Sequence, residues 1–133
     1  MNVSEDFDAW LLENYDEVHQ SILFSVAPLS DESAARAVDL GRANTDCARM
    51  GFLLTEAESY VLRAHAEAVV ETRRQNPGMQ YHERIVMARA YGLHLKALKI
   101  RDDLKVVVDA LSRKSYSIMN LNKTTFHPAQ SAH

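Results

Sequence analysis

The six histidines are the residues of this chain best suited to bind a metal ion, because neutral imidazole is a common metal ligand. No two of them, and no histidine and the single cysteine, stand three or four residues apart, the spacing that places two ligands on one side of a helix. Asp102 and Asp103 are adjacent, so on a helix they point about 100° apart and do not favour a shared proton or metal. Metalloprotease, Walker A, dinucleotide-binding and nucleophile-elbow motifs are absent. The sequence therefore predicts no catalytic residue, no metal site and no cofactor.

Positive and aromatic side chains in the second half of the chain indicate a different chemistry, the binding of a polyanion. Residues 84–123 contain nine Lys or Arg against three acids, whereas residues 1–39 contain nine acids against the single Arg36. Lys and Arg neutralise phosphates, and aromatic rings stack on unpaired bases. The residues predicted to contact single-stranded nucleic acid are Arg73, Arg74, Arg84, Arg89, Lys96, Lys99, Arg113, Lys114 and Tyr116. Alternatively, the acidic N-terminal helix pairs with the basic last helix, within one subunit or across an interface.

We expect helices to position these residues, because four Gly and three Pro are too few turn-forming residues for a fold of many strands. We expect one all-α domain, in which a long helical hairpin carries an N-terminal helix packed on it. Its parts are an acidic N-terminal helix over 1–29 with Ser4 as N-cap, a long helical region over 30–76, a long helix over 79–121 and a flexible tail over 123–133. The stretch RRQNPGMQ predicts the hairpin tip. At Gly41 and Gly51 the alternatives are a kink near Gly51, with Thr55 capping a second half, or the close approach of another helix.

The last helix has two apolar sides, which predicts self-association. One stripe follows alternating steps of four and three residues through Leu93, Ala97, Ile100, Leu104, Val107 and Leu111, and Ile118 follows one heptad later. A second set lies on another side and contains Leu95, Leu98, Val106 and Tyr116. One antiparallel neighbour cannot cover both, so either the N-terminal helix or another subunit must. The predicted interface residues of a homo-oligomer are Leu95, Leu98, Val106 and Ile118.

The compartment expected for this chain is the cytoplasm. The lone Cys47 cannot form an intrachain disulfide, and the N-terminus lacks the basic start and apolar core of a secretory signal. No window approaches eighteen uncharged apolar residues, so no membrane partner is expected.

The end of the last helix, DALSRKSYSIMNL, resembles the corresponding end of the UvsY family of phage recombination mediators. The matching residues are Asp109, Ala110 and Leu111, the pair Ser112 and Arg113, and Ile118. A basic helix end at Arg73 and Arg74, a polar turn and a long closing helix follow the same order over residues 55–122. The resemblance implies an α-helical subunit of a ring-like oligomer that binds single-stranded DNA and contacts a recombinase and a single-strand-binding protein.

Two functions from different classes follow. The first is a non-catalytic, oligomeric, single-stranded DNA-binding accessory protein of phage-type recombination or replication. The second is a helical protein–protein interaction or regulatory module that does not bind nucleic acid, whose acidic N-terminal helix covers the basic helix or imitates DNA toward a partner. An enzyme would require a pocket with converging polar groups.

Overall fold

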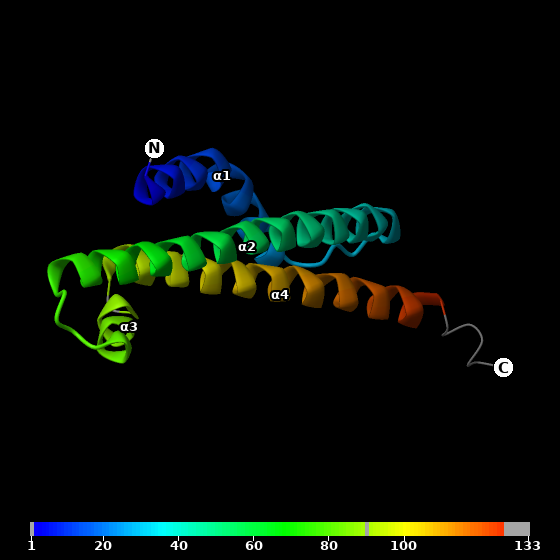
Figure 1. Ribbon diagram of the computed structural model, residues 1–133. Coiled ribbons are helices and arrows are strands. Elements are labelled where there is room, and N and C mark those ends of the chain that lie inside the picture. Colours follow the sequence, from blue (N-terminus) through cyan, green and yellow to red (C-terminus); the bar gives the residue numbers. More distant parts are fainter. Residues whose placement is uncertain (1, 90, 127–133) are drawn as a thin grey trace.

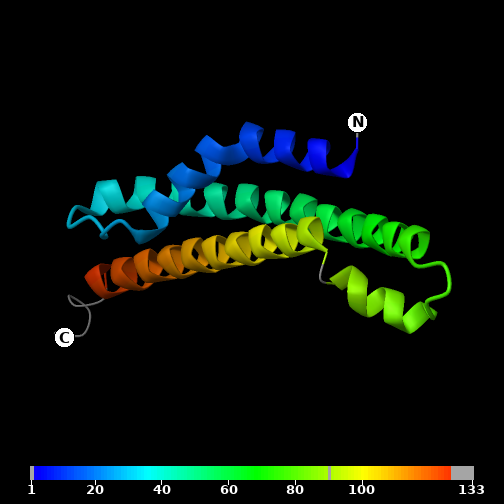
Figure 2. The ribbon, with the colours of Figure 1, turned by 90° about the vertical axis from the view of Figure 1, so that its left-hand side faces the viewer.

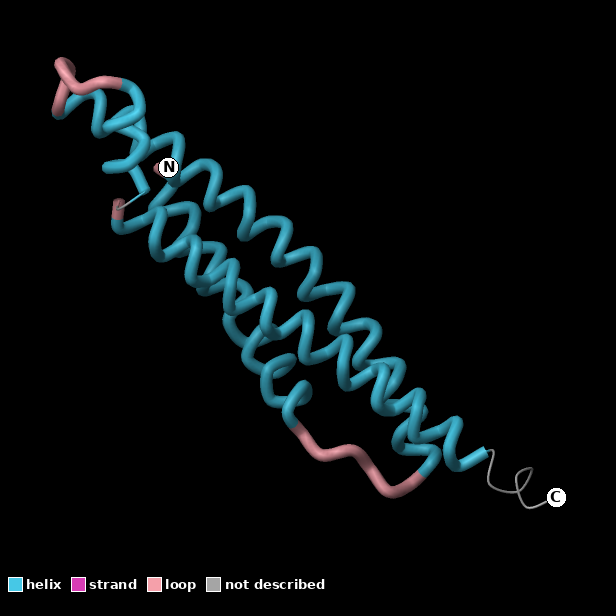
Figure 3. The backbone as a smooth tube through the Cα atoms, turned by 90° about the horizontal axis from the view of Figure 1, so that it is seen from below, coloured by secondary structure: helices cyan, strands magenta, loops and turns pink. Residues whose placement is uncertain are grey.

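The computed structural model is all-α and describes residues 2–89 and 91–126, except for the side chains of Val86, Arg89 and residues 124–126. Its helices, in chain order, are α1 (Val3–Val26), α2 (Ser33–Gln75), α3 (Tyr81–Arg89) and α4 (Gly92–Phe126) (Figure 1). α2 and α4 lie side by side and form the long hairpin that the sequence predicts (Figure 3). α1 runs alongside this hairpin, and the short α3 lies at its tip (Figure 2).

The N-cap of α1 is Asn2 rather than the predicted Ser4. The Asn2 side-chain oxygen accepts a hydrogen bond of 2.8 Å from the main-chain N–H of Glu5, which satisfies one of the free donors at the helix start. α1 ends before Ala27, whose backbone is extended as expected for a residue that precedes proline.

α2 is one uninterrupted helix, so a split near Gly51 with a second half capped by Thr55 is wrong. The Thr55 hydroxyl donates to the main-chain oxygen of Gly51 within the same helix instead of capping a new one. A Cβ atom added at Gly41 or Gly51 would meet no described atom of the chain within 4 Å. Neither glycine is therefore explained by close approach of another helix of the same chain.

The predicted single helix over 79–121 is also wrong, because two helices occupy this stretch. α2 ends at Gln75, as RRQNPGMQ predicts, and α3 spans only nine residues before α4 begins at Gly92. Glycine has one of the lowest helix propensities, so ending one helix and starting another next to Gly92 costs little free energy. α4 continues to Phe126, so residues 123–126 are helical and not part of a flexible tail, and 127–133 lie outside the described residues.

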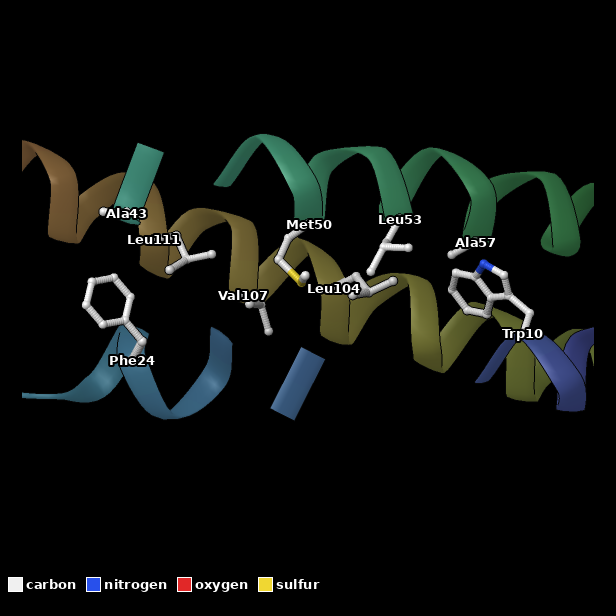
Figure 4. Close-up of a cluster of buried hydrophobic side chains, with 9 residues drawn as sticks. All are labelled: Trp10, Phe24, Ala43, Met50, Leu53, Ala57, Leu104, Val107 and Leu111. Carbon is white, nitrogen blue, oxygen red and sulfur yellow. The ribbon is translucent and has the colours of Figure 1, made fainter. Parts of the chain in front are cut away.

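The core lies between α2 and α4 and is closed on one side by α1. Met50 and Leu53 of α2 reach toward Leu104 and Val107 of α4, and Leu111 is fully buried beside them (Figure 4). The described members of the predicted α4 stripe are thus buried or half-buried, as its period requires.

α1 contributes three large aromatic side chains to this core. Phe7, Trp10 and Phe24 are buried, and Phe7 and Trp10 pack with Tyr60 of α2 at ring separations of 5.1 and 5.5 Å. Aromatic burial of this size contributes strongly to stability. The acidic N-terminal helix is therefore part of the folded core.

Candidate nucleic-acid interface

The acids of α1 bind cations of α2 more often than cations of α4. Asp6 contacts Arg63 at 2.8 Å and Glu17 contacts Arg49 at 2.7 Å, both on α2. Hydrogen bonds to these carboxylates raise the pKa of both guanidinium groups above the ordinary value. With α4 the acids of α1 form one ion pair within the described part of the chain, between Asp8 and Lys96 at 2.7 Å. Intramolecular pairing with the last helix therefore accounts for Lys96 but not for the other α4 cations.

The basic residues at the hairpin tip differ in whether their guanidinium groups are available to bind a polyanion. Arg73 is exposed and forms no ion pair with a described carboxylate. Arg74 contacts Glu71 at 2.6 Å, and this hydrogen bond lowers the pKa of Glu71, but the Arg74 side chain is still 76% exposed. Arg84 donates to the main-chain oxygens of Met79 at 2.8 Å and Pro77 at 3.4 Å. Arg73 and Arg74 can meet a polyanion, whereas Arg84 holds the turn together.

Lys114 was predicted to contact nucleic acid, and the structure contradicts this. The residue is 6% exposed, and its Nζ donates to the main-chain oxygens of Phe24 at 2.6 Å and Ala27 at 2.9 Å. Burial lowers the pKa of this ammonium, although the charge of Asp39 acts in the opposite direction. The reason is positional: Lys114 continues the buried stripe of α4 between Leu111 and Ile118.

Lys99 and Arg113 are the two predicted cationic contacts of α4 that are exposed and form no ion pair with a described carboxylate. They are two heptads apart, so they lie on the same side of α4 at a separation of about 21 Å. Tyr116 is 67% exposed nearby, and the side chain of Arg89 lies outside the described residues.

The four residues predicted to form the oligomer interface also differ in their exposure to solvent. Leu95 and Val106 are exposed, the latter at 64%, whereas Leu98 is half-buried against the small core cluster around Phe7. Ile118 is completely buried within this chain, so its assignment to an oligomer interface is wrong. It belongs to the stripe that packs on α2, which the 4–3 spacing already indicated.

An apolar cavity of about 380 Å³ lies between α1 and α4, and no local sequence pattern predicts it. Leu11, Val18 and Ile22 of α1 form one wall, and Ile100 and Val107 of α4 form the other. A cavity of this size and composition can accept an apolar side chain or a small apolar molecule.

His65 and His94 come together across α2 and α4, which their separation in the sequence does not reveal. Their ring centroids are 5.1 Å apart, and His94 is buried. Over the described ranges, no group of three or more His, Cys, Asp or Glu side chains is arranged to hold a metal ion.

No family model matches this chain, and neither a curated protein nor a solved structure matches it. The resemblance to the UvsY family stays a prediction. Within the described residues, no helix has the length and apolar character needed to cross a membrane.

Proposed function

We propose that this chain is a non-catalytic, oligomeric accessory protein that binds single-stranded DNA in phage-type recombination or replication. The observation that supports this proposal most is the pair Lys99 and Arg113, which are exposed on one side of α4 and form no ion pair with a described carboxylate. Arg73 and Arg74 extend the positive surface at the tip, and Tyr81 and Tyr116 are exposed aromatic rings available for stacking on bases.

Each of these contacts is weak by itself, so binding by this surface depends on repetition. Asp109 lies one turn before Arg113, and Asp102 and Asp103 lie one turn after Lys99, so these carboxylates reduce the local positive charge. Several copies of a weak site in one assembly act at high effective concentration and gain avidity. A recombinase and a single-strand-binding protein are the protein partners that the family resemblance would add.

Salt dependence tests the electrostatic part of the proposal. Fluorescence anisotropy of a labelled oligothymidylate should show binding at about 50 mM salt, with a log–log slope of about −0.7 per phosphate neutralised. A duplex of the same length, measured in parallel, reports the preference for single strands. Absence of binding to the single strand at this salt concentration would refute the proposal.

A second candidate function is a helical protein–protein interaction module that does not bind nucleic acid. The cavity between α1 and α4 favours it, because Tyr15 and Ile22 at its edge are large apolar residues that stay exposed. A folded protein that binds neither single-stranded nor duplex DNA would support this candidate over the first.

A further inference from the structure

Lys99 and Arg113 both lie beside hollows at the seam between α1 and α4. Lys99 stands one turn before Asp103, which lines the apolar cavity of about 380 Å³. Arg113 itself lines a second hollow of about 350 Å³, whose opposite wall includes Ser25 of α1. The α4 residues of the apolar cavity fall within positions 100–107, so along the helix the cavity lies between the two cations.

A stacked pair of aromatic rings stands at the mouth of the apolar cavity. Tyr15 and His19, one turn apart on α1, have ring planes only 4° from parallel and ring centroids 5.9 Å apart. Both side chains line the cavity and both are exposed, Tyr15 at 63%. Aromatic rings that are open to solvent beside cations are the surface on which single strands stack their bases. The α1 wall of the cavity therefore offers stacking, and the α4 wall has a cation beyond each end.

We propose that the cavity between α1 and α4 receives an unpaired base of the single strand, which stacks on Tyr15 and His19 while Lys99 and Arg113 contact phosphates on either side of it. This inference rests on the proposed function and adds the place where a base is held. The volume of the cavity is within the range of small-molecule sites, so a planar base can enter it. An intact duplex keeps its bases inside the stack, so this contact favours single strands.

The carboxylates near the cavity determine which part of the strand can lie where. Asp16 is exposed next to Tyr15 and forms no ion pair with a described cation, so phosphates should keep to the α4 side. Asp103 at the rim is also exposed and outside the ion pairs of the described residues. Its carboxylate repels a phosphate but can accept a hydrogen bond from the exocyclic amino group of cytosine. The rim is therefore better suited to a base than to a phosphate.

The fluorescence of Trp10 tests the position of the base, because Trp10 is the one tryptophan of the chain and lines the cavity. Oligodeoxycytidylate is the probe, since its bases carry the amino group that Asp103 can bind. Trp10 emission should be quenched in proportion to the bound fraction measured by anisotropy. A strand of the same length built from abasic sugar-phosphate units should bind more weakly and leave the emission unchanged. Oligodeoxycytidylate that binds without any change in Trp10 emission would overturn the inference and leave the proposed function standing.

Variants of the stacked pair test the contribution of the cavity to affinity. Tyr15→Ala removes the stacking surface and should weaken binding of oligodeoxycytidylate at least about fivefold, whereas Tyr15→Phe keeps the ring and should bind like the wild type. The matched control is Phe52→Ala, which removes an exposed ring from α2 that does not line the cavity and should retain the affinity. Circular dichroism checks that all three variants keep their helices.

The outcomes separate this inference from the proposed function. Wild-type affinity in Tyr15→Ala, or an equal loss in Phe52→Ala, overturns the inference alone and leaves the cavity to an apolar side chain of a protein partner. A wild-type protein that binds no single strand at about 50 mM salt removes the proposed function and the inference together.

Discussion

Lys114 of α4 holds the C-terminal end of α1 through the main-chain oxygen of Phe24, to which its Nζ donates a hydrogen bond of 2.6 Å. The same ammonium lies 4.1 Å from the centre of the Phe24 ring and donates to Ala27 at 2.9 Å. A cation at this end of a helix also complements the helix dipole. This lysine therefore joins two helices, and its effect on DNA binding should be indirect.

Replacing Lys114 with methionine should lower the free energy of unfolding by about 1–3 kcal/mol, because buried carbonyl groups at the end of α1 lose their donor. Urea denaturation followed by circular dichroism measures the change. Arg113→Met is the matched control, since this neighbouring side chain is exposed and its removal should change stability by no more than about 0.5 kcal/mol. Equal effects of the two variants would contradict the anchoring role of Lys114.

The stability of the wild-type protein should rise with alkaline pH relative to Lys114→Met. Burial lowers the pKa of Lys114 in the folded state, so the folded protein loses this proton before the unfolded chain does. Between the lowered pKa and the ordinary value of 10.5, the unfolded state binds more protons, and the free energy of unfolding increases with pH. Denaturation curves of both proteins from about pH 8 upward measure the difference. Parallel pH dependences would show that Lys114 does not titrate in this way.

Gly51→Ala should stabilise the protein by about 1 kcal/mol. Gly51 lies inside the continuous helix α2, and an added Cβ meets no described atom within 4 Å. Alanine removes backbone entropy from the unfolded chain without a steric cost in the folded one. Thermal or urea unfolding would reveal the gain, and a loss of stability would mean that an unseen neighbour occupies this space.

Ile118→Ala should cost about 2–5 kcal/mol, because Ile118 is fully buried and its truncation leaves a cavity in the core. Val106→Ala, on the exposed side of the same helix, should cost far less. The two variants, compared by urea denaturation, distinguish a core residue from a surface residue in the set predicted as an oligomer interface. An Ile118→Ala protein as stable as Val106→Ala would place Ile118 outside the core.

The hairpin could be predicted from the sequence because its signals are local. The 4–3 spacing from Ala97 to Leu111 indicates a buried stripe, and RRQNPGMQ indicates the tip. The same spacing includes Lys114 between Leu111 and Ile118, so its burial could also have been read from the pattern, but its charge suggested exposure. A long side chain can remain at a core position when its ammonium finds main-chain oxygens, as Lys114 does.

Contacts between distant helices could not be predicted in this way. The pair of Asp6 with Arg63 spans 57 residues, and it depends on the rotation and stagger of α1 on α2, which no local pattern specifies. The same is true of His65 with His94 and of the cavity between α1 and α4. The break between α3 and α4 was missed because the residues around Gly92 are otherwise compatible with a helix.

The central claim is that the Lys99 and Arg113 side of α4 contacts single-stranded DNA, and anisotropy titration of a charge-reversal pair tests it most directly. The double variant Lys99→Glu and Arg113→Glu should bind a labelled oligothymidylate at least about tenfold more weakly than the wild type at about 50 mM salt. The matched control, Lys105→Glu with Lys123→Glu, makes the same change in net charge on another exposed side of α4 and should retain most of the affinity. Wild-type affinity in the Lys99 and Arg113 variant, or equal losses in both variants, would contradict the claim.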